Sequence, residues 1–217
     1  MPSHAQADAA WKAPRRVAGW RWVFSTSTLA ALWLAFFETN LKISLRLGHP
    51  VGAGMMLLEL VVATLYVCRR QPLLTSASWF AWFAAGIGTF GALAARPDPH
   101  PLGGLEQLYF VLQLTGALAA VTSLLTLGRS FGVVAANRGV RTGGPYRLVR
   151  HPAYAGGLLT LTGYLLENPS LPNAAILLTV AFFQLRRIHH EEKFLNGDPG
   201  YREYRQRVRY RLLPYIY

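Results

Sequence analysis

The chain has 217 residues, of which 52% are hydrophobic and 15% are charged, and its formal net charge is +12. A soluble globular domain carries about a quarter charged residues, and the apolar residues here gather in long runs, so the composition indicates an integral membrane protein. The arginines flank these runs instead of forming a separate basic domain, which disfavours nucleic-acid binding. The single cysteine, Cys68, excludes an intrachain disulfide and a cysteine-based metal cluster.

Residues 1–21 are polar and basic, and we interpret them as an uncleaved cytoplasmic tail. Six apolar runs follow, at about 22–37, 51–68, 78–95, 105–127, 153–166 and 172–185. A spanning helix needs about 20 apolar residues, and the first four runs satisfy this if the first extends to Leu41. The last two runs are shorter. They predict either two short spans or a helical hairpin that does not fully cross, for a total of about five to six transmembrane helices.

The distribution of positive charge predicts the orientation of this all-α bundle. With six spans and the N-terminus inside, 19 of the 22 Lys and Arg residues lie inside, and only Lys42, Arg46 and Arg96 lie outside. This asymmetry fits the positive-inside rule. The loop at 128–154 and the C-terminal tail are therefore expected on the cytoplasmic side, where they can form one site.

The C-terminal tail reads as a helix from Arg187, a turn at 196–200 and a second helix. In the second helix Tyr201, Tyr204 and Val208 recur at helical spacing among arginines. This pattern is typical of a basic amphipathic helix at an anionic membrane surface. A direct role in substrate binding is the alternative.

The loop at 128–154 contains five arginines and no acidic residue, between two apolar runs. Its Gly143-Gly144-Pro145 sequence predicts a turn that lets the backbone approach a ligand closely. Pro152 suits the first turn of a helix, and the N–H groups at such a helix start favour an anion. The loop is therefore a candidate ligand site.

Three charged residues follow the last apolar run. Arg187 and Glu191 are four residues apart, so they share a helix face and can pair. With Glu192 they place a carboxylate doublet at the bilayer edge, where it can bind a cation or hydroxyl groups. The neighbouring His189 and His190 diverge on a helix, so no metal site is expected. Glu59, inside the second run, is a further functional candidate because acids within the membrane are costly.

Together these residues resemble the isoprenylcysteine carboxyl methyltransferase and phospholipid methyltransferase superfamily of integral membrane enzymes. The resemblance covers roughly the last ninety residues. It rests on the segments 127–131 and 143–156, and on Arg187, Glu191, Glu192, Leu195, Tyr201, Tyr204, Val208 and Pro214.

The resemblance implies S-adenosyl-L-methionine as the methyl donor, bound on the cytoplasmic side under the C-terminal segment, and membrane lipids as surroundings. It divides the chain into the tail at 1–21, a variable transmembrane region at 22–127 and a methyltransferase core at 128–217. It assigns Arg187 and Glu191 to catalysis and no metal to the site. The cofactor-binding positions it implies are Gly143, Gly144, Tyr146, His151, Pro152, Tyr154, Glu191 and Glu192.

The methyl acceptor stays open among an isoprenylated cysteine carboxylate, a phospholipid amine and a small or lipophilic thiol. Two other functions are alternatives to methyl transfer. Membrane sterol and enone reductases resemble the same half of the chain and bind NADPH, but the paired acids and the lack of an added phosphate-binding motif favour the methyltransferase. A non-enzymatic transporter or assembly protein would not need Arg, His, Tyr and paired Glu clustered on one side of the membrane.

Overall fold

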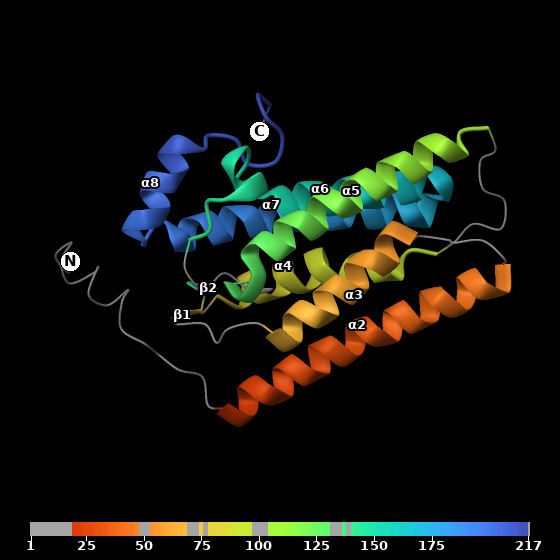
Figure 1. Ribbon diagram of the computed structural model, residues 1–217, viewed down its shortest axis with the longest axis horizontal. Coiled ribbons are helices and arrows are strands. Elements are labelled where there is room, and N and C mark those ends of the chain that lie inside the picture. Colours follow the sequence, from red (N-terminus) through yellow and green to blue (C-terminus); the bar gives the residue numbers. More distant parts are fainter. Residues whose placement is uncertain are drawn as a thin grey trace.

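The computed structural model describes residues 19–47, 53–68, 74–75, 78–96, 104–130, 136–137 and 140–216. Most of the predicted N-terminal tail therefore lies outside the described residues. The described chain is helical, as predicted, and its long helices lie side by side (Figure 1). The helices are α2 (Gly19–Leu47), α3 (Ala53–Cys68), α4 (Trp79–Phe90), α5 (Glu106–Leu127), α6 (Pro152–Glu167), α7 (Leu171–Leu195) and α8 (Pro199–Arg207). Short 3-10 turns add η1 (Gly91–Ala94), η2 (Gly128–Ser130) and η3 (Gly144–Arg147).

One small exception to the helical architecture joins two loops. Strand β1 (Leu74–Thr75) pairs antiparallel with β2 (Ala136–Asn137), with Leu74 opposite Asn137. The loop after α3 is thereby tied to the loop after α5, at the end of the bundle where α8 also lies (Figure 1).

Helices α2 to α7 overlap the six apolar runs, and side-chain caps mark the starts of α7 and α8. Helix α7 begins after Ser170, whose hydroxyl accepts a hydrogen bond from the Asn173 N–H at 3.3 Å. It continues past the apolar run to Leu195. Helix α8 then begins after Asp198, whose carboxylate accepts from the Gly200 N–H at 2.8 Å. The predicted sequence of helix, turn and second helix in the tail is confirmed.

Length and composition single out α5 as a membrane-crossing candidate within the described part of the chain. The apolar stretches Met56–Cys68 and Trp82–Ala94 are shorter than such a span. The number of five to six spans therefore stays a prediction.

Helices α5 and α6 make the most extensive contact of the bundle because their facing residues are small. A Cβ atom added to Gly156 would lie 2.5 Å from the backbone nitrogen of Ala120, and one on Gly116 would lie 2.5 Å from that of Thr160. Real Cβ atoms do not approach this closely. Glycine at both positions is therefore what lets the two backbones meet, as in other membrane helix pairs.

Candidate functional site

The C-terminal residues 208–211, which we call the C-terminal strap, run across the start of α6. The backbone N–H of Arg150 donates to the carbonyl of Tyr210 at 2.9 Å, and that of His151 donates to the carbonyl of Arg211 at 2.8 Å. The His151 N–H at the start of α6, which we expected to be available to an anion, is thus already bonded. The strap and the loop before α6 form one structural unit.

Glu192 fixes this unit from the side of α7. Its Oε1 accepts from Arg150 Nε at 2.7 Å and lies 3.3 Å from His151 Nε2, while its Oε2 accepts from Arg211 Nε at 2.9 Å. Burial alone would raise the pKa of the Glu192 carboxyl, but the hydrogen bonds from His151, Arg150 and Arg211 outweigh it and hold the pKa well below its usual range. Glu192 is therefore an anion whose two oxygens are engaged inside the protein.

The sequence singled out neither Arg150 nor Arg211 of this cluster, and Arg150 is the more buried of the two. Its side chain is 5% exposed, and besides Glu192 it donates from Nη1 to the carbonyls of Val208 at 2.8 Å and Arg209 at 2.6 Å. A buried guanidinium needs several acceptors, and these three partners supply them. The only indication in the sequence that Arg150 has a role here was its position between apolar Val149 and His151-Pro152.

Glu191 points to a different set of partners from its neighbour. The Tyr154 hydroxyl donates to Glu191 Oε2 at 2.8 Å. The Arg187 guanidinium lies 4.8 Å from the centroid of the Tyr154 ring, and its Nη1 donates to Thr89 Oγ1 at 2.8 Å. The His151 ring stacks on the Tyr154 ring, and the two ring centroids are 5.5 Å apart. Arg187, Tyr154 and Glu191 thus form a continuous polar chain.

Tyr146 belongs to an apolar cluster beneath the strap. It is buried with Tyr201, Tyr204 and Val208, and its carbonyl accepts from the Tyr204 hydroxyl at 2.8 Å. Burial first, and then the charge of Glu191, raise the pKa of the Tyr146 hydroxyl far above its ordinary value. The tyrosines at helical spacing in α8 therefore pack α8 onto the loop at 143–151.

The two glycines of the predicted ligand turn differ from each other. Gly144 has φ +55, in the left-handed region, and a Cβ there would lie 3.0 Å from Thr126 Oγ1. Gly143 has an extended conformation and nothing within 4 Å of an added Cβ. Glycine is thus required by the turn at Gly144, while Gly143 leaves open space beside the backbone.

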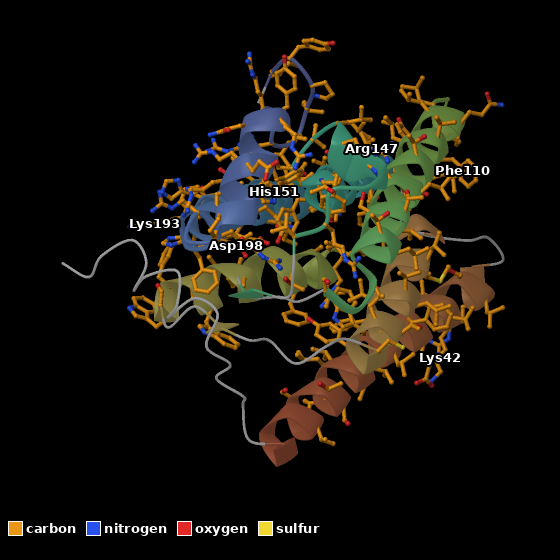
Figure 2. All side chains as sticks on the ribbon, turned by 60° about the vertical axis from the view of Figure 1, so that its left-hand side comes forward. Lys42, Phe110, Arg147, His151, Lys193 and Asp198 are labelled. Atoms are coloured by element: carbon orange, nitrogen blue, oxygen red, sulfur yellow. The ribbon has the colours of Figure 1, made fainter. Side chains whose placement is uncertain are left out.

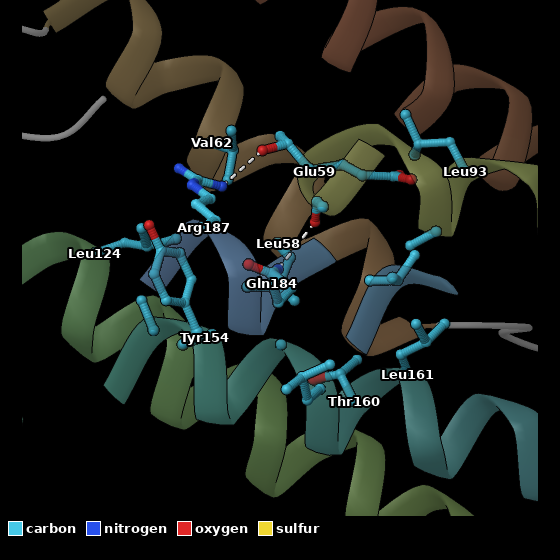
Figure 3. A pocket seen from close by; sticks show the side chains of 18 of the residues that line it. Leu58, Glu59, Val62, Leu93, Leu124, Tyr154, Thr160, Leu161, Gln184 and Arg187 are labelled. Atoms are coloured by element: carbon cyan, nitrogen blue, oxygen red, sulfur yellow. Dashed lines mark hydrogen bonds between the residues drawn. The ribbon is translucent and has the colours of Figure 1, made fainter. Parts of the chain in front are cut away.

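A cavity of about 160 Å³ lies among the helices next to this polar chain (Figure 3). Tyr154 and Arg187 line it, and Tyr154 also donates its hydroxyl hydrogen bond to Glu191. Most of its wall is apolar, with Leu58, Val62 and Leu161 among the lining residues. Its polar lining residues are Glu59, Thr89, Thr160, Gln184 and Arg187.

The structure therefore brings the predicted site residues together at one end of the bundle, in two adjoining groups. In Figure 2 the labels of His151, Arg147 and Lys193 lie in the upper part of the view, apart from Lys42 on α2 below. Pro152 opens α6 and places His151 at its start. The group around Glu192 holds the strap, and the group around Glu191 borders the cavity.

Comparison with known proteins identifies the family. The phospholipid methyltransferase family model matches residues 105–198, which contain α5, α6 and α7. A protein named "Probable protein-S-isoprenylcysteine O-methyltransferase" from Oryza sativa subsp. indica is 36% identical over 173 residues, which is 73% of this chain and 89% of that relative. The chain belongs to the isoprenylcysteine carboxyl methyltransferase and phospholipid methyltransferase superfamily.

A second relative from this superfamily matches a shorter part of the chain. Protein-S-isoprenylcysteine O-methyltransferase A of Arabidopsis thaliana is 35% identical over 120 residues, which is 48% of this chain and 60% of the Arabidopsis protein. The family-model match begins at the start of α5 and ends just before α8. It thus contains Arg187, Glu191 and Glu192, and methyl transfer is the reaction for which this superfamily and its relatives are named.

Proposed function

We propose that this protein is an integral membrane methyltransferase that uses S-adenosyl-L-methionine and methylates a lipophilic acceptor. The observation that carries the proposal is the shared wall of Tyr154 and Arg187. Both side chains line a mostly apolar cavity, Arg187 lies over the Tyr154 ring, and the Tyr154 hydroxyl donates to the Glu191 carboxylate. A methyl donor rich in charge and an acceptor rich in hydrocarbon would meet at this wall.

The residues around Glu191 fit the proposed donor. S-adenosyl-L-methionine supplies a methyl group on a sulfonium and carries an ammonium and an adenine ring. Glu191 Oε1 has no hydrogen-bond partner among the described residues, while Tyr154 fixes Oε2. Glu191 can therefore bind a cationic group, and the Tyr146 and Tyr154 rings with the space beside Gly143 can take an aromatic one.

Glu192 has a different role in this proposal. Its two oxygens already accept from Arg150, His151 and Arg211, so it shapes the donor site by holding the C-terminal strap in place. A direct contact of Glu192, His151 or Pro152 with the donor stays a prediction from family resemblance. The division into a variable region at 22–127 and a methyltransferase core at 128–217 is proposed on the same basis.

Arg187 is the proposed acceptor residue. The two relatives are named isoprenylcysteine O-methyltransferases, and we propose for this chain a similar acceptor, a lipophilic molecule with a carboxylate. A planar guanidinium binds a carboxylate through two parallel hydrogen bonds. Arg187 is 8% exposed beside the apolar cavity, and a site poor in water favours a reaction in which an anionic acceptor and a sulfonium lose their charges.

The proposed orientation places this site in the cytoplasm, with five to six helices in the bilayer. The charge asymmetry of the sequence supports it. A lipophilic acceptor would then reach the cavity laterally from the bilayer.

Equilibrium binding to the purified protein in detergent tests the donor. S-adenosyl-L-methionine should bind and NADPH should not. Glu191→Gln should weaken S-adenosyl-L-methionine binding by about 10-fold to 150-fold, because a hydrogen bond to a charged group contributes on the order of 1.5 to 3 kcal/mol. Glu203→Gln, on the exposed face of α8, is the matched control and should leave binding unchanged. Binding of NADPH in place of S-adenosyl-L-methionine would overturn the proposal.

A further inference from the structure

The cavity among the helices is lined by polar atoms that have no part in the proposed methyl transfer at Arg187. Its volume of about 160 Å³ is close to that of an engineered apolar cavity of about 150 Å³ that takes up benzene. Helices α3, α6 and α7 all contribute to its wall, and Glu59, Gln184 and Arg187 lie around it (Figure 3). The cavity is therefore matched to a compact group of about one ring in size.

Glu59 is the most buried acid facing this space, with 1% of its surface exposed. Its Oε1 accepts a hydrogen bond from Asn40 Nδ2 at 2.8 Å. Its Oε2 is buried and has no donor among the described residues. A buried acceptor without a donor is costly, so a ligand that supplies one gains affinity at this point.

Gln184 adds a second acceptor on the same cavity. Its Nε2 donates to the carbonyl of Gly88 at 2.9 Å, which turns the amide so that Oε1 is the remaining atom. That oxygen is buried and has no donor within the described part of the chain. Trp33, which also lines the cavity, has a buried Nε1 donor that no described residue accepts. Glu59, Gln184 and Trp33 thus present two acceptors and one donor that no described residue pairs.

We propose that Glu59, Gln184 and Trp33 form a recognition site for a hydroxyl group on the lipophilic part of the methyl acceptor. A hydroxyl donates one hydrogen bond and accepts others, so it satisfies both kinds of lining atom, whereas an ammonium group only donates. The acceptor is then a compact amphiphile with a hydroxyl embedded in hydrocarbon. This inference deepens the proposed function, because it takes the cavity as the acceptor site.

A pair of isosteric ligands tests the inference without requiring turnover. The full-length protein in lipid nanodiscs is titrated with 4-fluorophenol and with 4-fluorotoluene, which differ by a hydroxyl in place of a methyl group, and binding is followed by fluorine NMR. Dissociation constants are referred to the ligand concentration in the bilayer, measured on empty nanodiscs. The phenol should bind about 10-fold to 100-fold more tightly, because its hydroxyl has a hydrogen to donate to the buried acceptors and the toluene has none.

Glu59→Gln locates the preference. Glutamine keeps the size and the oxygen that accepts from Asn40, but it replaces Oε2 with an amide N–H donor, so the preference for the phenol should fall by about 10-fold. Glu38→Gln is the matched control, because Glu38 pairs with Lys42 on an exposed face of α2. Gln184→Met, which removes the second acceptor, should also reduce the preference and serves if Glu59→Gln does not fold.

Two results overturn the inference: equal affinity of the wild-type protein for both ligands, or an undiminished preference in Glu59→Gln. Titration of the same samples with S-adenosyl-L-methionine separates it from the proposed function. Donor binding without a phenol preference refutes only the recognition site. A phenol preference without donor binding refutes the proposed function and leaves the cavity site standing.

Discussion

Glu192→Gln should release the C-terminal strap from the start of α6. The substitution keeps the shape of the side chain but removes a charge that is 4% exposed and bonded to Arg150 and Arg211 at 2.7 and 2.9 Å. Removing one partner of a buried ion pair costs about 3 to 5 kcal/mol. Arg150 keeps its bonds to the Val208 and Arg209 carbonyls, so we expect the lower end, about 3 kcal/mol. The population of open strap should then rise about 150-fold.

Limited trypsin digestion of the purified protein measures this opening, because Arg209 and Arg211 lie in the strap and Arg207 directly precedes it. When opening is fast relative to cleavage, the cleavage rate follows the open population. Glu203→Gln removes only an exposed pair to Arg207 at 3.6 Å and should leave the rate unchanged. A rate in Glu192→Gln within twofold of the wild type would refute the view that Glu192 holds the strap.

The same cluster predicts a pH dependence. The pKa of Glu192 is lower in the folded protein than in the unfolded chain, where a glutamate has about 4.3. Its contribution to stability is therefore fully present above about pH 5, and it is lost as the pH falls below the unfolded value towards the folded one. Glu192 itself should not change strap protection between pH 5 and 8. If the protection of the strap from trypsin falls on acidification over that range, and falls equally in Glu192→Gln, a group other than Glu192 causes the change.

Three further predictions concern the acceptor residue, the helix contact and the topology. Arg187→Ala should lower turnover at saturating donor by about 100-fold while donor affinity changes less. Arg187→Lys should restore little of the turnover because lysine lacks the planar fork. A loss of donor affinity in Arg187→Ala as large as that in Glu191→Gln, with turnover preserved, would contradict this. Gly156→Ala should destabilise the bundle by about 1 to 3 kcal/mol in detergent unfolding, whereas Gly157→Ala, where an added Cβ meets nothing within 4 Å, should not, and equal effects would disprove the close approach. With Cys68 replaced by Ser, cysteines at Asn137 and Pro169 should be labelled from opposite sides in intact cells; labelling of both from outside would refute the orientation.

Apolar run length predicted the helices well, because a run of about 20 apolar residues has few alternatives to a helix in a membrane or a core. The different roles of Glu191 and Glu192 were harder to predict from the sequence. Adjacent residues on a helix point about 100° apart, so one carboxylate faces Tyr154 and the other faces Arg150. Which one is left available to a ligand depends on how α6 and the strap pack against α7, and a pattern within one helix does not contain that information.

Other features depended on contacts between distant segments. Arg150 and Glu192 are 42 positions apart, and Gln184 reaches Gly88 across 96 positions. Glu59 could be proposed as functional from its place in an apolar run, but its Asn40 partner and the cavity it borders arise only when α2, α3, α6 and α7 meet. The pairing of β1 with β2 had no signal in two-residue segments of this kind.

The β1–β2 pair has a consequence for exchanging acceptor preference between relatives. Besides the packing of α5 on α6, residues 22–127 are joined to the rest of the chain at this pair, where Leu74 and Thr75 pair with Asn137 and Ala136, and at Asn173, which hydrogen-bonds the Arg96 backbone at 3.0 and 2.8 Å. A chimera that takes its first half from another enzyme would need to preserve both junctions. Grafted helices with a shifted register at either junction would be displaced along their axes relative to the proposed donor site, however well their cavity suited the new acceptor.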